Sequence, residues 1–166
     1  NPIPKFIDLV LETKPTQVTL VPDSVNVITS NAGWDTIKNK DFLIEVISEF
    51  KRNNIRTSIF IDPDLQQIEG AKATGTDRIE LYTEAFAHQY GLGNKNAIKP
   101  YSDCATLANQ LGLGVNAGHD LSLDNIKFFK ENIETLLEVS IGHALISESL
   151  YLGIENVIQM YLHRLS

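Results

Sequence analysis

The sequence predicts an α/β fold built on a parallel β-sheet. Five short segments have the apolar, β-branched composition of buried strands. Amphipathic helical patterns separate them, so that a strand recurs roughly every 20 to 35 residues. Because repeated strand–helix units generate parallel sheets, the choice lies between an open, doubly wound sheet and a (β/α) barrel.

The first part of the chain predicts a helix over 5–13, which ends before Pro15 because a residue preceding proline avoids helical backbone angles. A strand over 17–21 follows. Residues 23–40 are polar and lack periodicity, which is typical of a functional lid or a mobile surface loop. A helix over 41–51 then carries apolar residues at helical spacing.

The middle of the chain repeats the strand–helix unit. A strand over 56–61 leads to a helix over 65–74, for which Gly75 is the expected stop. A third strand covers 78–82, and a glycine-containing segment predicts an irregular loop over 83–94.

The last part of the chain predicts two strands and four helices. A helix over 97–111 precedes a strand over 113–116, and a helix over 123–133 precedes a strand over 137–141. The final helices are expected over 144–151 and 154–165.

The order of these last elements favours a (β/α)8 TIM barrel. In such barrels the loops after strands seven and eight and the start of a short extra helix build a phosphate site. Gly118-His119 and Gly142-His143 follow the last two predicted strands at the corresponding places. We therefore expect residues 1–166 to form one domain that supplies about strands four to eight, the C-terminal two thirds of a barrel. Because five strands cannot close a barrel alone, we expect three strands to be missing upstream or supplied otherwise, and the chain starts at Asn1 rather than Met.

The composition limits the partners of the chain. A net charge of −7 argues against nucleic acid or an anionic membrane as a general partner. No apolar run approaches the roughly 18 residues that cross a bilayer. The single Cys104 has no partner for an internal disulfide, which favours a reducing compartment such as the cytoplasm.

The turn that carries His119 is the first candidate site. Gly118 allows a ligand to approach the backbone, and an imidazole transfers protons near neutral pH. A capping His in a tight turn, assisted by Asp120, explains the same pattern without function. In the second turn, Gly142 and His143 open a helix whose N–H groups suit a phosphate, although a plain helix start needs the same glycine.

Glu80 is an acidic residue inside an apolar strand. A buried carboxylate needs a partner or a raised pKa, so Glu80 is either an acid–base group in a barrel lumen or the partner of Arg56 or Arg78. Thr29 and Ser30 in the long loop offer hydroxyl donors to a ligand. The glycines around 112–118 lack the G-x-G-x-x-G spacing, and C-x-x-C, H-E-x-x-H and P-loop motifs are absent from the sequence.

Several of these segments together resemble the pyridoxine 5'-phosphate synthase family. The segments are 18–22 with Thr29-Ser30, 58–62, 79–83, GLGVNAGHD over 112–120 and IGHA over 141–144. The resemblance implies a (β/α)8 barrel enzyme of the transferase class that makes vitamin B6. Family members condense 3-amino-2-oxopropyl phosphate with 1-deoxy-D-xylulose 5-phosphate and release inorganic phosphate and water. They need no metal or redox cofactor and assemble as octamers.

By position, the resemblance implies His119 as the proton donor and Glu80 as the stabiliser of charged intermediates. Thr29 would contact the deoxyxylulose phosphate. The aminoketone phosphate would be bound by Asp120, Gly142 and His143. Asp120 departs from the family, where Gly is common, so it would have to bind through its backbone N–H.

The resemblance also implies missing parts, since nothing here matches the residues of the family's first three strands. We expect the 166 residues alone to be inactive in the full reaction. The alternatives are another phosphate-binding barrel, such as an isomerase or aldolase, and a non-catalytic half-barrel. A Schiff-base aldolase needs a Lys at a strand end, which none of the five predicted strands has.

Overall fold

The computed structural model describes residues 1–23 and 27–166, and within them five strands form one parallel sheet. The strands are β1 (Gln17–Leu20), β2 (Arg56–Ile61), β3 (Arg78–Tyr82), β4 (Gly114–Gly118) and β5 (Leu136–Ser140). Each strand pairs with the next along the chain, which gives the spatial order β1-β2-β3-β4-β5. The predicted α/β class is confirmed. This order differs from a doubly wound sheet, in which the strand order reverses at a switch point.

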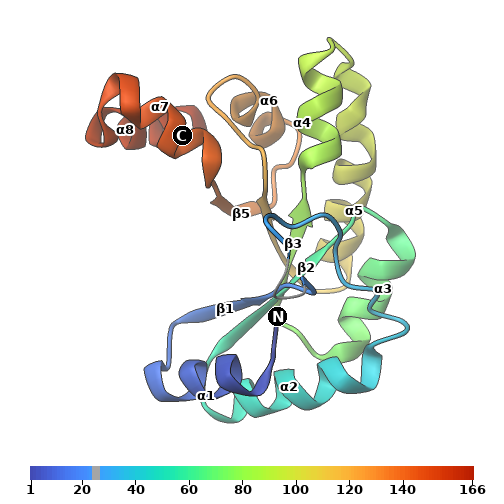
Figure 1. Cartoon of the computed structure of the whole chain (residues 1–166). Helices are drawn as coiled ribbons and strands as arrows, with labels where there is room; N and C mark the ends of the chain where they lie inside the picture. Colours follow the sequence, from blue (N-terminus) through green and yellow to red (C-terminus); the bar gives the residue numbers. More distant parts are fainter. Residues whose placement is uncertain (24–26) are drawn as a thin grey trace.

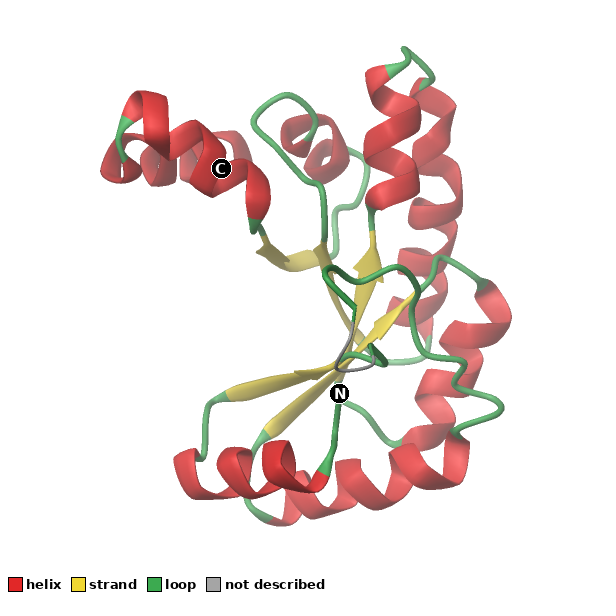
Figure 2. Cartoon of the chain, in the orientation of Figure 1, coloured by secondary structure: helices red, strands yellow, loops and turns green. Residues whose placement is uncertain are grey.

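Helices connect the strands and cover the sheet. They are α1 (Pro4–Thr13), α2 (Lys40–Arg52), α3 (Leu65–Thr74), α4 (Glu84–Gly91), α5 (Lys99–Gln110), α6 (Ile126–Glu131), α7 (His143–Leu152) and α8 (Ile154–Leu165), with a 3₁₀ turn over Lys95–Ile98. Figure 1 shows α2, α3 and α5 in an arc along one side of the strands. In Figure 2 the same elements form a helical layer outside the sheet.

The main core lies between this helical layer and one face of the sheet. Alternate strand residues such as Ile59, Ile79 and Val115 are almost fully buried there and pack with Phe50 and Ile68 from the helices. Successive strand residues point to opposite faces. The intervening residues are largely polar, so the other face carries pairs such as Ser58 opposite Arg78 and Glu80 opposite Asn116.

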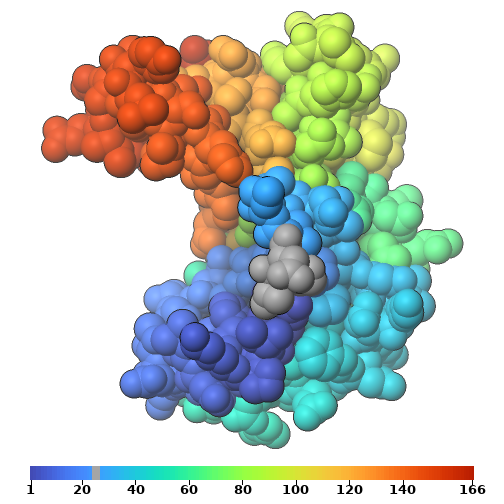
Figure 3. Space-filling view, in the orientation of Figure 1, coloured from blue at the N-terminus to red at the C-terminus, as the bar shows by residue number. Residues whose placement is uncertain are grey.

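The polar face of the sheet is concave. Gln17 on β1 donates a hydrogen bond of 2.9 Å to Glu138 on β5, although these are the first and last strands in the order. Thr19 on β1 similarly reaches Glu80 on β3 at 3.1 Å. In Figure 3 the surface is hollowed between the C-terminal helices and the N-terminal segment.

The C-terminal helices pack in a second, smaller cluster. Val157 and Tyr161 of α8 contact Leu123 and Ile126. All residues of α7 keep some exposure, and Leu150 and Tyr151 are among the most exposed apolar side chains of the described chain. Among the described residues, no helix combines the length and hydrophobicity that crossing a membrane requires.

Most predicted elements are observed within a few residues, with two exceptions. Residues 83–94 were expected to be irregular but contain α4, because Glu84, Ala85, Ala87 and Gln89 favour a helix and only Leu92 to Asn94 form the turn. Helix α6 is much shorter than the predicted 123–133. The predicted loop over 23–40 includes residues 24–26, which lie outside the described part.

Candidate functional site

The strand β4 ends in a bend with an uncommon backbone conformation. His119 and Asp120 follow Gly118 with φ angles of 82° and 59°. Residues with a Cβ seldom adopt positive φ, and Asp, Asn and His are the types that tolerate it best. The bend turns the His119 side chain over the carboxyl end of the sheet.

His119 contacts three groups. Its Nε2 lies 2.8 Å from the Thr29 hydroxyl, and its Nδ1 lies 3.1 Å from an Asp120 carboxylate oxygen at an angle unsuited to a hydrogen bond. The Tyr82 ring meets the imidazole edge-on, with 4.9 Å between centroids. Tyr82 also donates to the carbonyl of Ser30, 3.2 Å away. These contacts leave the imidazole 16% exposed and accessible from the cavity.

Glu80 is a buried carboxylate, 7% exposed, in the middle of β3. Burial raises its pKa above the ordinary value, and the negative charge of Glu138 adds to that rise. Hydrogen bonds from the hydroxyls of Thr19 and Ser140 act in the opposite direction but do not cancel it. Glu80 can therefore carry or donate a proton closer to neutral pH than an exposed glutamate can.

The second turn lies at the end of β5. Gly142 precedes the first residue of α7, His143, and both are exposed. The first N–H groups of a helix have no partners within that helix and favour anions. This turn therefore offers N–H donors beside an imidazole.

One cavity of about 350 Å³ joins these features. Its lining residues are Val21, Thr29, Ser30, Phe60, Glu80, His119, Asp120, Ser140, Ile141, Gly142 and His143. All six candidate residues from the sequence are among them. The two Gly-His turns, expected to converge on one pocket, do so.

Comparisons with known proteins agree with this arrangement. The family model described as "Pyridoxal phosphate biosynthesis protein PdxJ" matches residues 1–166. The chain belongs to this family. A relative from Flavobacterium johnsoniae, named "Pyridoxine 5'-phosphate synthase", is 74% identical over 99% of this chain and 70% of its own length. A relative of the same name from Christiangramia forsetii is 67% identical over 98% of this chain and 68% of its own length.

A solved structure supports the fold of this PdxJ-family chain. The structure titled "Crystal structure of Amycolatopsis orientalis BexX/CysO complex" matches with a TM-score of 0.57 and 17% identity. The match covers 95% of this chain, which spans 59% of the length of the solved chain. At this identity the likeness concerns the fold alone.

Of the two alternatives for Glu80 in this PdxJ-family chain, pairing with Arg56 or Arg78 is not observed. Arg78 pairs with Glu138 at 2.6 Å, and Arg56 approaches the same carboxylate at 3.7 Å. In the register of the sheet, Glu80 lies opposite Asn116, and Asn116 lies opposite Glu138. Both arginines thus pair with a carboxylate two strands away from Glu80 in the same row, and the hydrogen-bond partners of Glu80 are hydroxyl groups.

Two further residues of this PdxJ-family site were not found from the sequence. Tyr82 contacts His119, and Ser140 shares a hydrogen bond with Glu80. Tyr82 was detectable in principle, since it lies two residues after Glu80 on the same face of a strand. Ser140 depends on the pairing of β4 with β5, where it lies opposite Gly118. Among the described residues, no three His, Cys, Asp or Glu side chains form a group that could hold a metal ion.

Proposed function

We propose that this chain forms the catalytic face of a pyridoxine 5'-phosphate synthase. The enzyme would condense 3-amino-2-oxopropyl phosphate with 1-deoxy-D-xylulose 5-phosphate into pyridoxine 5'-phosphate, releasing inorganic phosphate and water. The observation that carries this proposal is the single cavity in which His119, Glu80, Thr29 and the Gly142-His143 turn meet. The names of relatives as much as 74% identical support the same activity.

The residue types suit the proposed reaction. Imine formation, loss of phosphate and ring closure all move protons, and His119 would donate them from the bend after β4. Glu80, with its raised pKa, would stabilise positively charged intermediates when ionised. Because Glu80 and His119 line the same cavity, a substrate that fills it would contact both.

Two phosphorylated substrates require two anion-binding regions. The N–H groups at Gly142 and His143, together with the N–H of Asp120, would hold the aminoketone phosphate. Thr29 would contact deoxyxylulose phosphate. Thr29 lies 2.8 Å from His119 Nε2 in this structure, so a substrate that needs that nitrogen must replace the threonine.

We also propose that the five strands are strands four to eight of a (β/α)8 barrel within a single domain. Sequential strand order, helices along one side and side chains that meet across the concave face support this proposal. Closing the sheet would require partners for the outer edges of β1 and β5. The octameric assembly implied by the family resemblance and the cytoplasmic location favoured by the single Cys104 belong to the same proposal. Light scattering of the purified full-length gene product tests the octamer.

The substitution His119→Asn in the full-length gene product tests the proposed activity. We expect kcat for ring synthesis to fall by about 10²- to 10⁴-fold, the usual contribution of a general acid. His88→Asn is the matched control, since His88 is an exposed residue of α4 outside the cavity. Turnover that is unchanged in His119→Asn would contradict the proton-donor role. A wild-type protein without synthase activity would refute the function itself.

A further inference from the structure

The bend at His119 needs an external restraint to keep its conformation. Two consecutive residues with side chains hold positive φ angles there, and that region is disfavoured for any residue with a Cβ. If either residue relaxed to an ordinary conformation, the direction of the His119 Cα–Cβ bond would change. The proposed acid would then leave its place in the cavity that Glu80 also lines.

Two buried side chains bind the carbonyl groups of this bend. Thr83, fully buried after β3, donates its N–H to the carbonyl of Gly118 at 3.0 Å and its hydroxyl to the same oxygen at 2.8 Å. The Thr83 hydroxyl also contacts the carbonyl of His119. Asn125, 5% exposed, donates its side-chain N–H to the carbonyl of Asp120 at 3.1 Å. Three consecutive carbonyls are thereby fixed.

We propose that Thr83 and Asn125 are positioning residues that hold His119 in its catalytic orientation. The inference rests on the proposed function. Thr83 is important because it follows Glu80 by only three positions, at the end of the same strand. One short segment thus carries both the Glu80 carboxylate and the Thr83 hydroxyl that holds the bend at His119. The separation of the two groups is therefore set by β3 and is independent of the exposed loop that carries Thr29.

The substitution Thr83→Val tests this role, because valine keeps the shape of threonine and loses only the hydroxyl. We expect kcat of the full-length enzyme to fall by roughly 10-fold or more, since small misplacements of reacting groups are costly. KM for deoxyxylulose phosphate should change much less, because Thr29, the residue proposed to contact that substrate, is not among the hydrogen-bond partners of Thr83. The pH dependence of kcat should also shift. Thr83→Ser, which restores the hydroxyl, should recover most of the turnover.

Thr74→Val is the matched structural control. Thr74 is also a buried threonine, and its hydroxyl donates to the carbonyl of Ala71 at 2.7 Å at the end of α3. Its substitution removes an equivalent buried hydrogen bond outside the residues that line the cavity. We expect lower stability with unchanged kcat and an unchanged pH profile. If Thr83→Val behaves like Thr74→Val, the proposal is overturned.

A second measurement separates this proposal from the proposed function. The imidazole ¹⁵N resonances of His119, assigned with His119→Asn, report the ring environment without any substrate. They should shift in Thr83→Val and return toward wild type in Thr83→Ser, even if the wild-type protein makes no pyridoxine phosphate. If Thr83→Val does not fold, Asn125→Asp replaces it, because aspartate keeps the acceptor for Ser122 N–H and loses the donor to Asp120. Unchanged resonances and kcat in Asn125→Asp would overturn the proposal.

Discussion

At the scale of single residues, the chemistry of the site depends on which carboxylate the arginines of the concave face pair with. Arg56 and Arg78 lie on the same concave face as Glu80 but pair with Glu138. Glu80 is held by hydroxyls instead, and its pKa is raised chiefly because burial disfavours its charged form. Moving one arginine to Glu80 would lower that pKa and make the group a poorer proton carrier near neutral pH.

Because the pKa of Glu80 is raised, the stability of the Glu80→Gln variant relative to wild type should increase with pH. The pKa of Glu80 is about 4.5 in the unfolded chain and higher in the folded protein. Such a carboxyl group makes its full contribution to stability only below the unfolded-state pKa. This contribution is lost as the pH rises through the folded-state pKa. The unfolding free energy of Glu80→Gln relative to wild type should therefore increase between about pH 4 and pH 8. Urea denaturation across this range measures it.

Glu45→Gln, at an exposed position on α2, controls for the loss of one negative charge. Glu80→Gln should also lose synthase turnover, by about 10²-fold or more if the carboxylate takes part in proton transfer. A stability difference that stays constant across the pH range would contradict the raised pKa.

The sequence identified the candidate site residues but not their hydrogen-bond and ion-pair partners. His119, Glu80 and His143 were found because their positions at or near strand ends are local features. The pairing of Glu80 with Thr19 was not found, because it crosses from β1 to β3 over a curved sheet. Strand register and sheet curvature determine such contacts, and a short stretch of sequence specifies neither.

At the scale of elements, strands were predicted more reliably than the segments between them. The five strands carry uninterrupted apolar and β-branched residues, and their locations agree within about two residues. Helix α4 was missed because Gly91 and Gly93 suggested a loop, although they mark only where the helix stops. The extension of β4 to Gly118 was also missed, since the small residues Ala117 and Gly118 resemble a turn but pair with Leu81 and Tyr82 in the sheet.

Gly118 is required by the close approach of β4 to the site. A Cβ added there would lie 2.5 Å from the Glu80 carboxylate and 3.0 Å from Ser140 Cβ. We expect Gly118→Ala to lower the unfolding free energy by about 1–3 kcal/mol and to displace Glu80, because the site has no room for a methyl group. Chemical denaturation and synthase turnover measure the two effects.

Gly91→Ala is the matched control at the end of α4, where a Cβ would meet no atom within 4 Å. Alanine favours a helix, so this variant should be neutral or more stable by up to about 1 kcal/mol. Equal destabilisation by the two substitutions would show that loss of backbone freedom, and not the contact with Glu80, explains the requirement.

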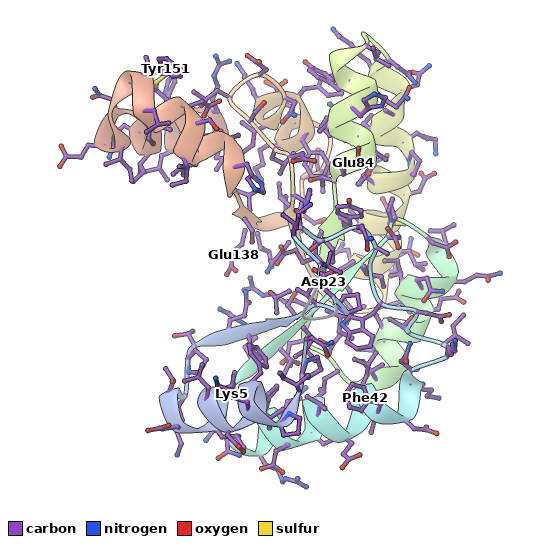
Figure 4. All side chains as sticks on the ribbon, in the orientation of Figure 1. Lys5, Asp23, Phe42, Glu84, Glu138 and Tyr151 are labelled. Carbon is purple, nitrogen blue, oxygen red and sulfur yellow. The ribbon has the colours of Figure 1, made fainter. Side chains whose placement is uncertain are left out.

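At the scale of the whole molecule, one carboxylate connects strands that are distant in the order of the sheet. Glu138 on β5 accepts from Gln17 on β1 at 2.9 Å and pairs with Arg78 on β3 at 2.6 Å. Figure 4 shows Glu138 extending from β5 toward the N-terminal half of the molecule. Side chains thus connect the two edge strands across the concave face. The same curvature brings Thr19 within hydrogen-bond distance of Glu80.

Glu138→Gln should weaken this connection across the sheet. Burial alone would raise the pKa of Glu138, but Gln17, Arg78 and Arg56 together lower it. The charge therefore stabilises the fold above about pH 4.5, and this contribution disappears as the pH falls through the lowered pKa. We expect a loss of about 1–2 kcal/mol near pH 7, moderated by the partial exposure of the carboxylate, and a smaller loss near pH 3.

Asp103→Asn provides the comparison, since Lys99 and Asp103 form an exposed pair on one helix and should contribute at most about 0.5 kcal/mol. An effect of Glu138→Gln as small as that of Asp103→Asn would mean that the contacts of Arg78 and Gln17 with residue 138 do not need its negative charge.

Hydrogen exchange adds a second criterion. Because Gln17 donates to the same carboxylate from the edge strand, amides of β1 should exchange faster in Glu138→Gln, whereas those of β4 should be much less affected. Faster exchange confined to β5 would indicate that the curvature is held by the backbone and its helical layer instead.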